Sequence, residues 1–167
     1  AGRELVALST PGHASHHHTF WDPAGRIAYT GDVAGTRLPD FYLPLAAVVP
    51  PEFDVEAVEA SLDRIRALNP AVLCLAHATA VRDVDRHLDI LGRQLRDWEE
   101  LIEGYVAAGL SEVEMADRLR AINQRNEDGT PLDPHTARLQ EIQSPAAFAV
   151  AGYLRYFQTR ARREAAG

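Results

Sequence analysis

The hydrophobic pattern of this chain changes at about residue 80. Before that point, apolar residues come in short runs that end at turn-forming residues, such as residues 5–8 before residues 9–12, which is typical of strands. After it, they recur in steps of three and four residues from Val84 to Tyr105, which is typical of one long helix. The sequence therefore predicts an α/β segment over residues 1–80 and a helical extension over residues 81–167.

Further strands are predicted in the first segment. Residues 19–21 and 26–30 form two runs joined by the turn residues 22–25, and residues 71–76 form a continuous apolar run. Such a run indicates a strand buried on both faces, and we expect Cys74 within it to be a small buried residue. Between these strands, residues 33–53 hold four of the ten prolines and predict a long loop.

The helices are predicted from their ends. Asp54 is expected to cap a helix that stops before Pro70, and the long helix from Val84 is expected to stop at Gly109. Ser111 begins a capping-box pattern that runs to Ile122. Two more helices are predicted after N-cap and proline pairs at residues 133–134 and 144–145. The face that we expect the last helix to bury consists of Phe148, Ala151, Leu154 and Phe157.

Length, composition and charge exclude several classes of protein. The 167 residues are about one domain's worth, and the net charge of −7 argues against a nucleic-acid partner, which needs a basic face. The chain holds no apolar run near the roughly 18 residues that a membrane span requires. A single cysteine cannot form an internal disulfide. We therefore expect a cytoplasmic protein that acts on a small molecule.

Three residues of types that bind metals stand at the ends of predicted strands. His13 follows the turn residues Pro11 and Gly12, Asp32 follows a second strand, and His77 follows a third. Neutral imidazoles and a carboxylate suit zinc, iron or manganese, and a bridging carboxylate could join two ions. The alternative is structural: a turn histidine, a loop-capping aspartate and a histidine hydrogen-bonded at a strand end.

The same residues resemble a known family. Residues 9–17, 28–32 and 75–77 are similar, in order, to the third, fourth and fifth motifs of the metallo-β-lactamase-fold hydrolases. The resemblance implies an αββα sandwich in which His13 binds one metal, Asp32 bridges two, and His77 binds the second. Residues 152–156 resemble, more loosely, part of the C-terminal extension of bacterial members.

One motif of that family is absent. The upstream HxHxDH run is missing, because residues 16–18 contain an HxH pair but Thr19 and Phe20 follow it. We therefore expect the chain to be the second half of the sandwich plus a helical extension. The N-terminal half would lie on a separate chain, be lost by proteolysis or be left out of this sequence, which also fits the absence of an initiator Met.

That missing half has a physical consequence. The ligands His13, Asp32 and His77 leave each metal short of four-coordination, and half a sandwich exposes an apolar sheet face. We expect the chain alone neither to bind metal tightly nor to catalyse.

Other residues are candidates for the substrate side of the site. His17 should point away from His16 and His18 on an extended segment, and we expect it to line the pocket while its neighbours face solvent. Arg37 and Tyr42 lie in the loop after Asp32, which is placed to close over a substrate. The alternative for this loop is a surface crossover packed by its own prolines.

The resemblance implies a metal-dependent hydrolase in its intact form. Two divalent ions, zinc or alternatively iron or manganese, would lower the pKa of a water that attacks an ester-, thioester- or lactone-like small molecule, and Asp32 would help to orient it. Two other functions stay open: a mononuclear iron persulfide oxygenase, and a non-catalytic fragment or subunit that pairs with an N-terminal-half partner. The helical stripe also leaves a homodimer open.

Overall fold

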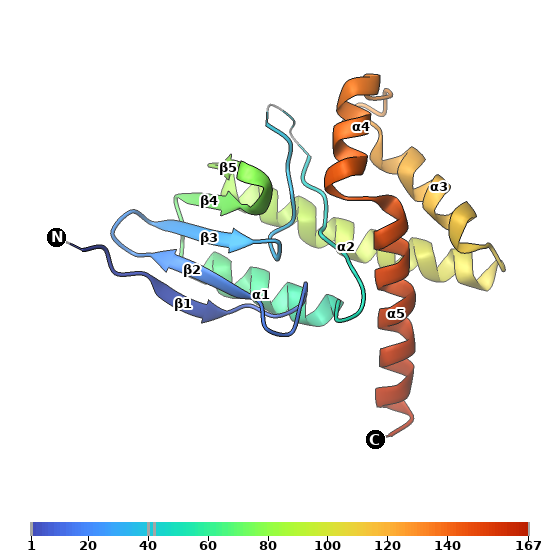
Figure 1. Cartoon of the computed structure of the whole chain (residues 1–167), viewed down its shortest axis with the longest axis horizontal. Coiled ribbons are helices and arrows are strands. Elements are labelled where there is room, and N and C mark those ends of the chain that lie inside the picture. The colour runs from blue at the N-terminus through green and yellow to red at the C-terminus, as the bar shows by residue number, and fades with distance from the viewer. Residues whose placement is uncertain (1, 40, 42, 167) are drawn as a thin grey trace. The chain divides into compact units, whose positions relative to one another are not determined.

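The computed structural model describes residues 2–39, 41 and 43–166 (Figure 1). The chain forms two compact units. The first comprises Ala1–Ala47 and Asp54–Leu95, and the second comprises Val48–Phe53 and Arg96–Gly167. Among the described residues, no helix is long and apolar enough to cross a membrane.

The first unit contains a five-stranded sheet in the order β1-β2-β3-β4-β5. The bounds of the strands are β1 Val6–Ser9, β2 His18–Asp22, β3 Ile27–Gly31, β4 Val72–Leu75 and β5 Ala80–Val81. The pairs β1–β2, β2–β3 and β4–β5 are antiparallel, whereas β3–β4 is parallel. A parallel pair needs a crossover, and α1 (Val55–Ala67) lies in that connection. The mixed α/β architecture predicted from the sequence is confirmed.

The sheet topology places three strand ends at one edge. Because β1 and β3 are each antiparallel to β2, they run in the same direction, and β4 runs parallel to β3. The carboxyl ends of β1, β3 and β4 therefore lie at the same edge of the sheet. The segments that follow these ends carry His13, Asp32 and His77.

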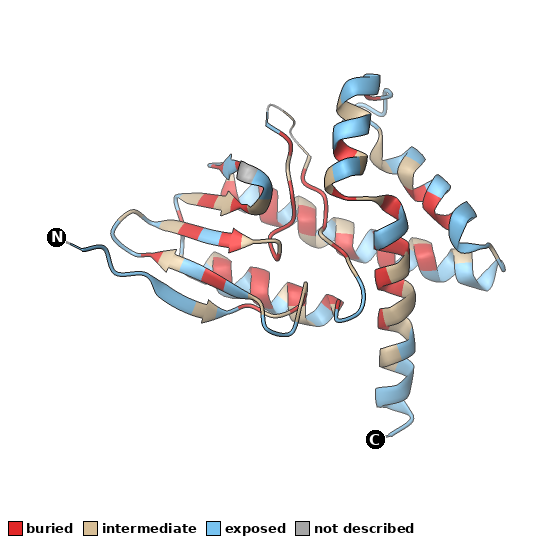
Figure 2. Cartoon of the chain, in the orientation of Figure 1, coloured by how far each residue is buried: buried red, intermediate tan, exposed pale blue. Residues whose placement is uncertain are grey.

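The two faces of the sheet differ in burial. Thr19, Ala28 and Leu73 alternate onto the buried face, and Figure 1 shows α1 and α2 (Val84–Ala107) behind the sheet. The opposite face carries Phe20 and Tyr29, whose exposed fractions are 47% and 38%. The alternation along β2 and β3 is visible in Figure 2.

The prediction that β4 is buried on both faces is wrong. Its pattern alternates between buried and half-buried residues, so Val72 and Cys74 are only partly covered. The apolar character of these residues is real, but within the described residues nothing covers this face of the sheet completely. Cys74 is accordingly a half-buried free cysteine rather than a buried one.

The helix α1 begins where its sequence predicts. The Asp54 side chain accepts a hydrogen bond from the Ala57 amide at 3.0 Å, which satisfies a free N–H of the first turn. The helix is fixed to the turn after β1, since Ser61 Oγ donates to the Pro11 carbonyl at 2.6 Å and the Asp54 amide donates to the Gly12 carbonyl at 2.9 Å.

The later helices are α2 Val84–Ala107, α3 Glu112–Asn123, α4 Pro134–Gln143 and α5 Ala146–Glu164. Predicted caps account for the end of α2 and for the beginnings of α3 and α4. After α2, Gly109 has a φ of +71°, and the Gly109 and Leu110 amides bond to the Val106 and Tyr105 carbonyls as in a Schellman motif. Ser111 forms the complete capping box of α3, and Asp133 caps α4.

Two predictions for the last helix are wrong. Ser144 is the C-cap of α4, and the N-cap of α5 falls on Pro145. The buried face of α5 is also different, because Phe148 is 55% exposed. The helix instead buries Tyr153 and Tyr156, whose rings pack edge-on against Phe53 at centroid distances of 5.1 and 6.2 Å. The predicted face followed a spacing of three residues from Phe148. The buried face instead contains Tyr153 and Tyr156 together with alanines, so the prediction did not find it.

Candidate metal centre

The structure brings His13, Asp32 and His77 together at the edge of the sheet where β1, β3 and β4 end. The Nε2 atom of His13 lies 3.8 Å from Asp32 Oδ2, and the Nε2 atom of His77 lies 3.7 Å from Asp32 Oδ1. Both separations exceed the usual hydrogen-bond range. Each carboxylate oxygen of Asp32 therefore faces the Nε2 atom of a different imidazole without a direct hydrogen bond.

The backbone turn before His13 fixes where its ring points. Gly12 has a φ of +133°, and a Cβ atom on it would lie 2.7 Å from the Val58 Cα, so a larger residue would push the turn away from α1. The Nδ1 atom of His13 lies 2.7 Å from the Ala47 carbonyl oxygen. Because a carbonyl only accepts, Nδ1 carries the proton, and the lone pair of the neutral ring is on Nε2, which faces Asp32.

Asp32 follows a glycine that makes room for His17. Gly31 has a φ of +54°, and a Cβ atom there would lie 2.6 Å from His17 Nε2. The other ring nitrogen of His17 lies 3.1 Å from Thr10 Oγ1, which in turn lies 3.0 Å from Thr19 Oγ1. Burial, and then the nearby His13, lower the pKa of His17.

His77 lies on a strained piece of backbone. It falls inside a short 3₁₀ segment, Ala76–Ala78, but has φ and ψ of 60° and 29°, a left-handed conformation that costs a non-glycine residue about 1–2 kcal/mol. Its side chain is 47% exposed, so burial of the ring does not explain the strain. Such outliers cluster at functional sites, and here the backbone conformation presents Nε2 to Asp32.

Comparison with known proteins identifies the segment that carries these residues. The family model described as the metallo-beta-lactamase superfamily matches residues 1–77. Residues 1–77 belong to the metallo-beta-lactamase superfamily. This confirms the resemblance drawn from the strand-end motifs. No curated protein matches the chain.

Solved structures also match the chain, each at low sequence identity. A metallo-beta-lactamase family protein from Thermus thermophilus matches with a TM-score of 0.56 and 20% identity over 96% of this chain, and 46% of that protein is covered. The chain thus spans about half the length of that relative. An archaeal superfamily protein from Sulfolobus tokodaii matches with a TM-score of 0.43 and 21% identity, covering 58% of this chain and 47% of that one. The chemotaxis sensor ODP from T. denticola matches with a TM-score of 0.43 and 17% identity, covering 55% and 44%.

The donor set of the metallo-beta-lactamase segment suits divalent metals. A metal–nitrogen and a metal–oxygen bond together span roughly 4.2 Å, which exceeds both separations at Asp32, so one ion can contact both atoms of either pair. Each pair supplies two protein donors. Within the described ranges, no three His, Cys, Asp or Glu side chains are grouped closely enough to hold a single ion.

The substrate-side candidates are placed differently from one another. His17 lies beside Asp32, whereas His16 and His18 are exposed. The Arg37 guanidinium donates to both carboxylate oxygens of Asp83 at 3.0 and 3.1 Å. Tyr42 lies outside the described residues. The roles of His17, Arg37 and Tyr42 toward a substrate stay predictions.

Sequence reasoning overlooked the residues behind the candidate ligands. His87 donates from Nε2 to the Ala34 carbonyl at 2.8 Å, and Thr79 donates from Oγ1 to the Arg37 carbonyl at 2.5 Å. For His87 a signal existed, since it is a polar residue three positions after Val84, on the apolar stripe of the long helix. No feature of the sequence marks Thr79 in this way.

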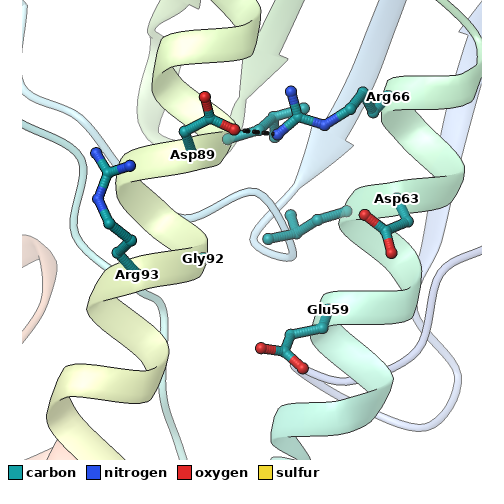
Figure 3. Close-up of a pocket in the computed structure, with 8 residues that line it drawn as sticks. Glu59, Asp63, Arg66, Asp89, Gly92 and Arg93 are labelled. Atoms are coloured by element: carbon teal, nitrogen blue, oxygen red, sulfur yellow. Dashed lines mark hydrogen bonds and ion pairs between the residues drawn. The ribbon is translucent and has the colours of Figure 1, made fainter.

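A groove of about 460 Å³ lies between α1 and α2, and none of the candidate ligands lines it. Leu62 and Leu88 contribute its apolar surface, and Arg66 reaches from α1 to Asp89 on α2 at 2.6 Å (Figure 3). Arg66 also pairs with Asp85 at 3.1 Å. These ion pairs tie the two helices together at one end of the groove.

Proposed function

We propose that this chain carries one part of the active centre of a metal-dependent hydrolase that acts on an ester-, thioester- or lactone-like small molecule. The observation that carries the proposal is the position of Asp32 between His13 and His77, with one carboxylate oxygen toward each Nε2 atom. Superfamily membership of residues 1–77 supports the same conclusion.

Each residue has a distinct task in the proposed centre. His13 and His77 would offer one imidazole nitrogen each, and the hydrogen bond from His13 Nδ1 to the Ala47 carbonyl keeps that ring in the required tautomer. Asp32 would offer one carboxylate oxygen toward each metal position and could accept a hydrogen bond from a bound water. A bound pair of divalent ions, with zinc the first choice, supplies Lewis acidity and lowers the pKa of water.

The proposed hydrolase needs a second half of the fold. Two protein donors at each position fall short of the usual four-coordination, and the apolar sheet face with Phe20 and Tyr29 lacks a covering layer within the described residues. An N-terminal half of the same fold would supply both further ligands and that layer. Activity is therefore proposed only for the combined halves.

The test is to supply an N-terminal half, fused or co-expressed, and to assay zinc-loaded protein on ester, thioester and lactone panels. Asp32→Asn should lower kcat/KM by at least about 100-fold, because the neutral amide holds metal and orients water poorly. His18→Gln is the matched control, since His18 is exposed on the neighbouring strand. Full activity in Asp32→Asn, or activity that survives complete metal removal, would contradict the proposal.

The exposed sheet face also favours a second candidate, a non-catalytic subunit that pairs with an N-terminal-half partner. Both candidates predict association through Phe20 and Tyr29, but only the hydrolase predicts turnover. A stable complex that binds no metal and hydrolyses none of the panel would favour the subunit. Oxygen consumption with a persulfide by the iron-loaded complex would instead indicate the oxygenase.

A further inference from the structure

The turns that carry Asp32 and His77 are joined by a set of contacts behind the candidate ligands. The turn after Asp32 is closed by a hydrogen bond from the Gly35 amide to the Asp32 carbonyl at 2.8 Å. The turn around His77 is closed by a bond from the Leu75 amide to the Thr79 carbonyl at 2.9 Å. Further contacts connect the first turn to α2, and connect the second turn to Arg37.

His87 on α2 holds the first turn. Its exposed fraction is 1%, and its Nε2 atom donates to the Ala34 carbonyl at 2.8 Å. Because the carbonyl only accepts, the proton is on Nε2. Nδ1 is buried and has no hydrogen-bond partner among the described residues. An unpaired buried polar atom destabilises the fold, a cost that a leucine at this position would avoid. The bond to the Asp32 turn helps to offset this cost.

Arg37 joins the first turn to the second. Its guanidinium donates to both carboxylate oxygens of Asp83, the residue before α2, at 3.0 and 3.1 Å. Its carbonyl accepts the Thr79 hydroxyl at 2.5 Å. Thr79 is two residues after His77 and is itself buried. Arg37 therefore contacts both the segment after His77 and the approach to α2.

We propose that His87 and Arg37 are positioning residues that hold the Asp32 carboxylate between His13 and His77. The proposal rests on the proposed function, because it gives this arrangement a task in metal binding. It assigns Arg37 to the scaffold, through Asp83 and Thr79, rather than to a substrate. Each residue acts through the backbone beside a ligand-bearing turn, His87 through the Ala34 carbonyl and Arg37 through its own carbonyl, which accepts the Thr79 hydroxyl.

The first experiment measures amide hydrogen exchange by NMR in the metal-free full chain. His87→Asn is too short to reach Ala34 and should raise the exchange rate of the Gly35 amide by about tenfold or more, whereas His87→Gln can still donate and should restore it. Arg37→Met should do the same to the Leu75 amide. The control is Arg66→Met, which removes two ion pairs from α1 and α2 but touches neither turn.

Two results would overturn the positioning role at this stage. One is unchanged exchange of Gly35 and Leu75 in both variants. The other is an equal rise at the Val58 amide in α1, which would indicate general destabilisation rather than release of the turns. Because no metal is present, this experiment is independent of the proposed hydrolase.

The second experiment titrates zinc into the chain combined with an N-terminal half, the form for which the metal centre is proposed, and follows the ring signals of His13 and His77 by NMR. In the unmodified chain both rings should shift together, since both face Asp32. His87→Asn should weaken zinc binding by about tenfold, with rescue in His87→Gln. Zinc binding of equal strength in all variants would overturn the positioning role, whereas the absence of any ring shift in the unmodified chain would contradict the proposed metal centre instead.

Discussion

Gly31 determines how closely the His17 ring can lie against the end of β3, just before Asp32. It combines a φ of +54° with a Cβ position 2.6 Å from His17 Nε2, so a side chain there is strained twice. We expect Gly31→Ala to lower the free energy of unfolding by about 1–3 kcal/mol and to shift the ring signals of His17. Urea unfolding and NMR measure the two effects.

Gly92 provides the matched glycine control. It lies within α2, and a Cβ atom there would meet nothing within 4 Å. Gly92→Ala should raise the free energy of unfolding by about 0.5–1 kcal/mol, because alanine loses less backbone entropy in a helix. Equal effects of the two substitutions would contradict the strain assigned to Gly31.

His87 links stability to pH. Burial, as the largest cause, lowers the pKa of its ring below the ordinary value near 6.5, and Arg37 lowers it further, while the bond to Ala34 and the Asp83 carboxylate oppose the shift. Just below pH 6.5 the unfolded chain therefore binds more protons than the folded chain. The free energy of unfolding should fall as the pH drops from 7 through 6.5 toward the folded-state pKa.

Urea unfolding at a series of pH values checks this prediction. His87→Gln keeps the hydrogen bond to Ala34 but cannot titrate, so its loss of stability over the same window should be smaller. His17, whose pKa is also lowered, remains in both proteins and contributes equally. Identical pH profiles for the two proteins would contradict the assignment to His87.

At the scale of elements, α5 shows how a helix can be predicted correctly and its face incorrectly. The helix buries Tyr153 at 0% exposure and Tyr156 beside it, whereas Phe148 faces outward. Tyr153→Ala should lower the free energy of unfolding by about 3–5 kcal/mol, because it removes a fully buried ring. Phe148→Ala should cost less than about 1 kcal/mol. Equal losses of unfolding free energy in the two variants, measured by urea unfolding, would instead support the buried face predicted from the sequence.

Element ends were predictable because their chemistry is local. Asp54, Ser111 and Asp133 cap the helices that the sequence assigns to them, since a cap needs only a side-chain oxygen and nearby amides. The strand-end positions of His13, Asp32 and His77 were readable for the same reason. Their approach to within 4 Å depends on the direction of β1, β3 and β4, which only the sheet pairing determines.

Contacts between distant segments were not predictable from local pattern. His87 and Ala34 are 53 residues apart, and Thr79 and Arg37 are 42 apart, so no spacing rule links them. The prediction that β4 is buried on both faces was wrong for a related reason. An apolar run indicates only that a face can be covered, and not that another layer covers it. Whether Cys74 and Val72 are covered depends on a layer that the described residues do not provide.

At the scale of the whole molecule, the open sheet face is the surface on which association with an N-terminal half would depend. Phe20 is 47% exposed on this face, and burying the rest of its ring would contribute about 1–2 kcal/mol to binding. Phe20→Lys also places a charge in the proposed interface. We therefore expect it to weaken the complex of the two halves by at least about tenfold in a titration followed by calorimetry.

Phe148→Lys is the control for that titration. Phe148 is more exposed than Phe20, but it lies on α5 in the second unit and is not part of the sheet, so its substitution should leave the affinity unchanged. If both variants bind the N-terminal half as tightly as the unmodified chain, the sheet face is not the interface. If both weaken binding equally, the halves associate through general apolar contact. Only a loss confined to Phe20→Lys assigns the association to the face opposite α1 and α2, and with it the completion of the centre around Asp32.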